Sequence, residues 1–177
     1  CGSLRAGSLN GMALRLAGEC MPQGMALEVI EWSQVQPFNA DVLEQQGVPA
    51  PVQRIRDRIA RAIGHWRPDM PGCHAVLGMY AFGLEEMGAY GQAESVGRRA
   101  VELQPQDGWA WHAVAHVMEM QGRRRDGVAW LGEHSTTWNE VSLFATHNSC
   151  NLGLCHLGLD KVEEVLELLE EQLLGSA

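Results

Sequence analysis

The fold is decided by residues 77–105, LGMYAFGLEEMGAYGQAESVGRRAVELQP. Small and apolar side chains recur three or four residues apart on both sides of Gly88, which is the spacing of residues on one face of an α-helix. Gly88 interrupts the pattern in the middle, and Pro105 ends it. The stretch therefore predicts two antiparallel helices joined by a short turn, with small residues where the helices touch.

The same pattern returns 34 residues later. This offset relates Leu77 to Trp111, Ala81 to Ala115, Leu84 to Met118 and Gly88 to Gly122. A third, weaker unit runs through Leu154 and Gly158 and ends in an acid-rich amphipathic helix, as expected of a solvent-facing last helix. Such a period predicts stacked helix pairs that resemble tetratricopeptide repeats, and three units suffice for a continuous core.

Three segments of this region resemble one family in more detail. PDMPG at 68–72, VLGMYAFGLEE at 76–86 and HAVAHVMEMQG at 112–122 resemble the tetratricopeptide repeat protein thirty-eight family, over roughly Ile63 to Leu169. HNSCN at 147–151 stands where that family shows an HNWWH-like run, from which it departs at its last three residues. The resemblance implies a helical-repeat fold and no particular biochemical activity.

The N-terminal stretch GSLRAGSLN at 2–10 has a different character. Its glycines and serines allow a tight turn that exposes backbone N–H groups, and an apolar helical pattern follows at once. A loop that opens a helix in this way is typical of an anion-binding site. Further on, MALEVIE at 25–31 alternates in the manner of a β-strand. We therefore expect the order loop, helix, strand.

These residues resemble the NADPH-dependent FMN reductases of flavodoxin-like fold, whose loop reads GSLRxGSxN. PFNAD at 37–41 and GVPAPVQRIR at 47–56 resemble later stretches of the same family. The resemblance implies FMN as cofactor and NADPH as reductant, with no catalytic residue, because the flavin supplies the chemistry. The residues that would hold the FMN phosphate are Ser3, Arg5, Ser8 and Asn10. A second interpretation is that these residues only cap a helix.

Two strands of the family's sheet are missing. The first should precede Gly2, and the third should follow Ala62. We therefore expect a chimera, with a truncated flavodoxin-like βα segment over 1–62 and a tetratricopeptide-like repeat domain over 63–177. The predicted fold class is mainly α, an α-α superhelix preceded by that βα segment. Whether the chain is an enzyme stays open, because one strand cannot build a flavin site. The expected helices lie roughly at 10–21, 49–63, 73–88, 90–104, 108–121, 124–133, 142–157 and 160–174, with one strand at 25–31.

Charge and cysteine usage limit the partners. Residues 1–66 hold six arginines and six acids, so the whole net charge of −9 belongs to the later residues. An acidic repeat region argues against nucleic acid, whose phosphates need a basic face. The sequence contains no run of about 18 apolar residues, so no membrane contact is expected. The five cysteines are odd in number and lack CxxC spacing, which favours free thiols in a cytoplasmic protein.

Histidines gather in the second repeat. His112 and His116 lie four residues apart and Glu119 three further on, so the three share a helix face, and His147 comes from the next repeat. This set is compatible with a divalent metal, with ligand contacts in the inner groove, or with histidines that only pack in the core. Because the HExxH glutamate is missing, we assign the four residues to a ligand groove and predict neither a metal site nor a catalytic residue.

The preferred function is a non-enzymatic scaffold that binds a peptide or a small molecule in its concave groove. The competing function is an NADPH-dependent FMN reductase, an oxidoreductase impaired by truncation. Apolar surface left uncovered by the missing neighbours also predicts self-association. The two functions differ in whether the protein binds FMN.

Overall fold

Every regular element of the computed structural model is a helix within the residues that the structure describes, which are 5, 7–139 and 144–170. The expected strand is absent, because residues 25–31 have no regular secondary structure. The prediction of a flavodoxin-like βα segment is therefore wrong. A lone strand leaves its backbone N–H and C=O groups unpaired, and the described residues supply no neighbouring strand to pair with them.

The chain separates into two units, Cys1–Arg61 and Ala62–Ala177. The helices that begin in the first unit are α1 (Leu9–Glu19), α2 (Ala40–Gln46) and α3 (Ala50–Ile63). None of these three helices buries a residue. The expected helices near 10–21 and 49–63 are confirmed, whereas α2 was not predicted. Asn39 begins α2, because its side chain accepts a hydrogen bond from the backbone N–H of Asp41 at 2.9 Å.

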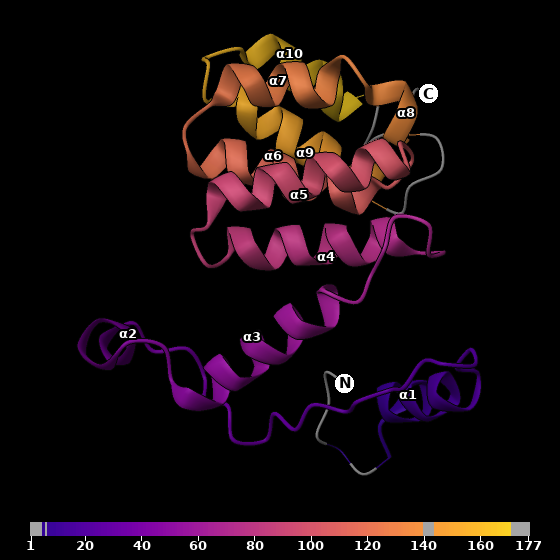
Figure 1. The fold of residues 1–177 in the computed structure, drawn as a ribbon. Helices are drawn as coiled ribbons and strands as arrows, with labels where there is room; N and C mark the ends of the chain where they lie inside the picture. The colour runs from indigo at the N-terminus through magenta and orange to yellow at the C-terminus, as the bar shows by residue number, and fades with distance from the viewer. Residues whose placement is uncertain (1–4, 6, 140–143, 171–177) are drawn as a thin grey trace. The chain divides into compact units, whose positions relative to one another are not determined.

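The second unit is built of three helix pairs, which are stacked in Figure 1. The pairs are α4 (Cys73–Glu85) with α5 (Tyr90–Leu103), α6 (Gly108–Met120) with α7 (Arg124–Gly132), and α9 (Ala145–Leu157) with α10 (Val162–Leu168). The first helix of each pair packs on its own partner, and α6 also packs on α4 and α9. The six helices predicted for this region are confirmed over the described residues; the predicted start at 142 and end at 174 lie outside them. A short helix between the second and third pairs, α8 (Ser135–Asn139), was not predicted.

The turn inside each pair repeats one hydrogen-bonding pattern. In every turn a backbone N–H donates to the carbonyl five residues earlier, as Ala89 does to Leu84 (2.9 Å), Arg123 to Met118 (2.8 Å) and Lys161 to His156 (3.0 Å). The residue before each donor has a left-handed backbone, namely Gly88 (φ 74°), Gly122 (φ 69°) and Asp160 (φ 60°). This bond is a common way to end a helix. Its recurrence shows that the three pairs are equivalent hairpins.

The core of the second unit gathers around tryptophan. One cluster of buried side chains consists of Trp111, Ala115, Leu131, Trp138 and Leu152. Trp138 comes from the short helix α8, is 1% exposed, and donates its Nε1 hydrogen to the carbonyl of Leu131 at 3.1 Å. A five-residue helix therefore supplies one of the largest buried side chains of the unit.

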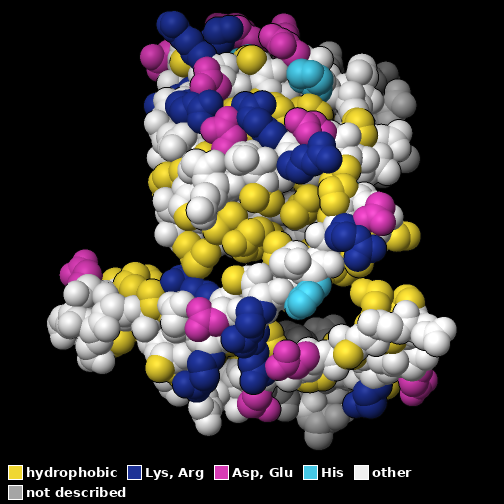
Figure 2. Space-filling view, in the orientation of Figure 1, with side chains coloured by type: hydrophobic (Ala, Val, Ile, Leu, Met, Phe, Trp, Pro, Cys, Tyr) yellow, Lys and Arg dark blue, Asp and Glu magenta, His cyan; other side chains and the backbone are white. Residues whose placement is uncertain are grey.

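The surface of the second unit is divided between charged and apolar regions. On the face drawn in Figure 2, charged side chains of both signs lie over α5 and α7, whereas hydrophobic side chains gather over α4. Met79 on α4 is 57% exposed. The predicted self-association has an apolar surface available to it here and stays a prediction. Among the described residues, no helix has the length and apolar character needed to cross a membrane.

The close contact between α5 and α6 requires a glycine. A Cβ at Gly97 would lie 2.5 Å from Cγ2 of Val114, which is fully buried, and 3.4 Å from Cβ of Ala81. We expect Gly97→Ala to lower the free energy of unfolding by about 1 kcal/mol, because overpacking outweighs the gain in helix propensity. Gly83 on α4 is the matched control, since its Cβ would meet open space, and Gly83→Ala should raise that free energy by a similar amount. Urea denaturation of both variants checks the pair; a stabilised Gly97→Ala would mean that α5 and α6 are not in close contact.

Candidate functional site

Three histidines from two hairpins meet in the second unit. His112 and His116 lie on α6 and His147 on α9. One ring nitrogen from each residue lies within 4.8 Å of the others. The ring centroid of His112 is 4.3 Å from that of His116 and 4.5 Å from that of His147. The structure thus brings together three of the four residues that the sequence assigned to a ligand groove; we call them the imidazole cluster.

A different carboxylate from the predicted one borders the imidazole cluster. Glu119 is half-buried and outside the cluster, whereas Glu85, at the end of α4, is 4% exposed. Oε2 of Glu85 lies 3.8 Å from Nδ1 of His116 and has no hydrogen-bond partner among the described residues. Burial, with the negative charges of Glu86 and Glu119, raises the pKa of Glu85. Glu85 precedes Glu119 by the 34-residue repeat period, so the repeat register was the signal that would have found it.

His112 lies deepest in the cluster and is 3% exposed. The carboxamide Nδ2 of Asn151 lies 2.9 Å from its Nδ1, within hydrogen-bonding distance. Burial, with the neighbouring His116 and His147, lowers the pKa of His112 to about 3. The ring is therefore neutral at physiological pH, with Nδ1 engaged by Asn151 and Nε2 on the opposite side of the ring. Asn151 was not identified from the sequence, because its role depends on the packing of α9 against α6.

Aromatic rings wall the imidazole cluster. The ring centroids of Phe82 and Trp109 lie 5.5 Å and 5.3 Å from that of His112, and Phe144 packs on Trp109 at 4.7 Å. Nε1 of Trp109 is buried and lacks a hydrogen-bond partner within the described part of the chain. Apolar walls with a few unsatisfied polar groups are typical of a ligand site. The unsatisfied Nε1 of Trp109 is one such polar group.

Two of the four residues expected to hold FMN, Ser8 and Asn10, lie at the start of α1. Ser3 is outside the described residues, and Arg5 and Asn10 are exposed. Ser8 is 7% exposed, and its Oγ accepts a hydrogen bond from the backbone N–H of Gly11 at 3.1 Å. Ser8 therefore caps α1, as the second interpretation of the loop proposed.

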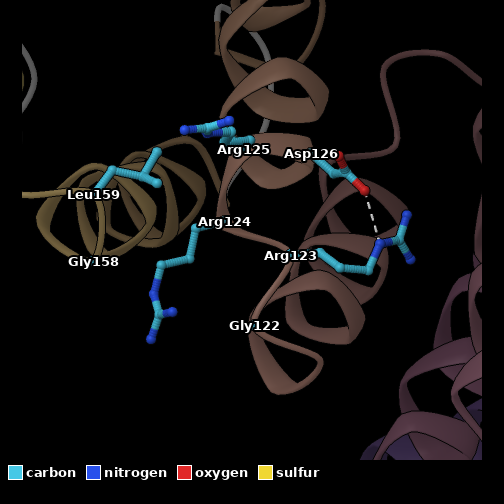
Figure 3. A pocket seen from close by; sticks show the side chains of 7 residues that line it. All are labelled: Gly122, Arg123, Arg124, Arg125, Asp126, Gly158 and Leu159. Atoms are coloured by element: carbon cyan, nitrogen blue, oxygen red, sulfur yellow. Dashed lines mark hydrogen bonds and ion pairs between the residues drawn. The ribbon is translucent and has the colours of Figure 1, made fainter.

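A hollow of about 290 Å³ lies elsewhere in the second unit, at the turns after α6 and α9 (Figure 3). It is lined by Gly122, Arg123, Arg124, Arg125, Asp126, Gly158 and Leu159. Arg123 points toward Asp126 and donates to it at 2.8 Å, and it donates to Glu94 on α5 at 2.6 Å. These acids raise the pKa of Arg123. The same acids neutralise part of the positive charge of Arg123. The hollow is therefore a weaker candidate for a functional site than the imidazole cluster.

Comparison with known proteins bears on the N-terminal part alone. The chain is 41% identical to an NAD(P)H-dependent FMN reductase of Pseudomonas aeruginosa over 61 residues. The match covers 34% of this chain and 32% of the reductase. The chain thus spans about a third of this curated relative. No protein-family model matches the chain, and no solved structure matches it. The N-terminal part is similar to an FMN reductase, while the resemblance of residues 63–169 to a tetratricopeptide family stays a prediction.

Proposed function

We propose that the chain is a non-enzymatic helical-repeat scaffold that binds a peptide or a small molecule at the imidazole cluster. The proposal rests on one observation: buried polar atoms without partners lie beside the imidazoles, on α4 and α6, which are the first helices of two successive hairpins. These atoms are Oε2 of Glu85 and Nε1 of Trp109. An unsatisfied buried polar atom costs about 1–3 kcal/mol, and a ligand that bonds to it removes this cost.

Access and charge support the same conclusion. His147 is exposed, so a ligand can reach the cluster from solvent. Glu85 offers a carboxylate, and the aromatic walls attract cations through their ring faces. The net charge of −9 adds a long-range attraction for positive groups. The ligand is therefore expected to carry a positive charge.

Selection from a phage-displayed library of random peptides tests this proposal. The full chain, with EDTA present, is expected to enrich peptides that contain Lys or Arg beside an aromatic residue. His147→Ala and Phe82→Ala should remove this enrichment, whereas His65→Ala, which changes an exposed histidine of the same unit, should keep it. Enrichment that survives both cluster variants, or none on the wild type, would contradict the proposal.

A second candidate function is FMN binding by the N-terminal part, favoured by its similarity to the reductase of Pseudomonas aeruginosa. Titration of FMN fluorescence with the full chain tests this candidate. Quenching that Arg5→Ala weakens would support it. Unchanged fluorescence at about a hundred micromolar protein would leave α1 as a helix capped by Ser8, without a flavin role.

A further inference from the structure

We infer that the imidazole cluster binds a divalent transition-metal ion, zinc being the simplest case, through one ring nitrogen each of His112, His116 and His147. The inference rests on the proposed function, since it names the ligand class of the same site. The metal ion is the positive charge that the site takes, and it leaves one coordination position for a donor from a peptide, a small molecule or water.

The spacing of the nitrogens fits such a site after a small adjustment. Zinc binds histidine nitrogen at about 2.0–2.1 Å, so tetrahedral ligand nitrogens lie about 3.3 Å apart. The three nitrogens here lie within 4.8 Å of one another. The side chain of His116 is 29% exposed and His147 is exposed, so both rings can rotate toward the buried ring of His112. Only one of the three histidines is fixed by burial.

Two of the rings lie near polar side chains of the kind that orient metal-binding histidines. A metal ligand usually donates its second ring N–H to a carboxylate or a carbonyl, which orients the ring. The carboxamide of Asn151 lies 2.9 Å from Nδ1 of His112, within hydrogen-bonding distance. Oε2 of Glu85 lies 3.8 Å from Nδ1 of His116, so that a small rotation of this half-exposed ring would bring the two into a hydrogen bond. Turning that carboxamide by half a rotation places its oxygen at Nδ1, so that Nδ1–H donates and Nε2 is left to the metal. Both partners thus leave Nε2 as the ligating atom.

The donor set also selects the class of ion. Imidazole suits zinc, copper, nickel and iron, whereas magnesium and calcium prefer oxygen ligands. The buried carboxylate of Glu85 compensates the added positive charge without occupying a ligand position. Because His147 is exposed, water or a ligand from solvent can reach a metal ion held by the cluster. We therefore expect zinc to bind and magnesium not to compete with it.

Competition between the full chain and a chromophoric zinc chelator tests the inference, after EDTA treatment and gel filtration. One zinc ion per chain is expected. His116→Ala and His147→Ala should each weaken binding about tenfold or more, and Glu85→Gln by about 10–100-fold through loss of the outer partner. Two controls should leave the affinity unchanged: His65→Ala, an exposed histidine, and Cys150→Ser, which removes an exposed thiol from α9.

The outcomes separate this inference from the proposed function. Circular dichroism of each variant in EDTA shows whether it is folded, and the exposed His147 gives the variant least dependent on packing. No zinc binding at about a hundred micromolar, equal binding by His147→Ala and wild type, or loss of binding in Cys150→Ser would overturn the inference. If peptide selection in EDTA still depends on Phe82 and His147 in that case, the scaffold stands without a metal; if it does not, both fail.

Discussion

Replacing Trp138 by alanine is expected to lower the free energy of unfolding by about 4 kcal/mol. The side chain is 1% exposed and packs with Trp111, Leu131 and Leu152. The loss combines the transfer of a large aromatic ring to water with the cavity that remains. Urea denaturation followed by circular dichroism measures the change.

Trp138→Phe is the matched control for this experiment. Phenylalanine keeps an aromatic ring but cannot donate to the carbonyl of Leu131, so a loss of about 1–2 kcal/mol is expected. A loss below about 1 kcal/mol for the alanine variant would mean that α8 does not contribute to the core. The difference between the two variants isolates ring packing from the hydrogen bond.

The second large effect is the dependence of stability on pH through His112. Burial and the two neighbouring imidazoles lower its pKa from 6.5 to about 3 in the folded chain. Below pH 6.5 the unfolded chain therefore binds a proton that the folded chain does not, and stability is lost as pH falls toward 3. At pH 4 this loss is about 3 kcal/mol relative to pH 7.

Comparison of the wild type with His112→Gln, in EDTA, isolates this effect from the other titrating groups. The wild type should lose stability more steeply than His112→Gln between pH 7 and pH 4. His65→Gln should follow the wild type, because His65 is exposed. Parallel curves for wild type and His112→Gln would contradict the burial of His112.

The repeats were predictable because their signals are local and periodic. Gly88 and Gly122 are needed for left-handed turns, and such glycines are visible in a single sequence. His112 and His116 were expected on one face because they lie four residues apart on the same helix. By contrast, Glu85 and Asn151 reach the imidazole cluster from α4 and α9, so their roles depend on how hairpins pack against one another.

The strand was mispredicted for a related reason. Alternation at 25–31 is a local pattern, but a strand exists only where a neighbouring strand binds its backbone, and the described residues offer none. The sequence similarity to an FMN reductase extends over about a third of that relative, so the rest of its sheet is not part of the match. The short helices α2 and α8 were not predicted, because five to seven residues are too few to show the hydrophobic periodicity of a helix.

The central claim is that the imidazole cluster binds a metal ion. The visible absorption spectrum of the full chain with one equivalent of cobalt(II) tests it most directly, because the d–d bands of cobalt depend on its coordination number and ligands. We predict intense d–d bands of a four- or five-coordinate site with nitrogen ligands, which zinc displaces and which disappear in the double variant His116→Ala His147→Ala. The weak spectrum of hydrated cobalt in the wild type, or strong bands that persist in the double variant, would contradict the assignment of the imidazole cluster as a metal-binding site.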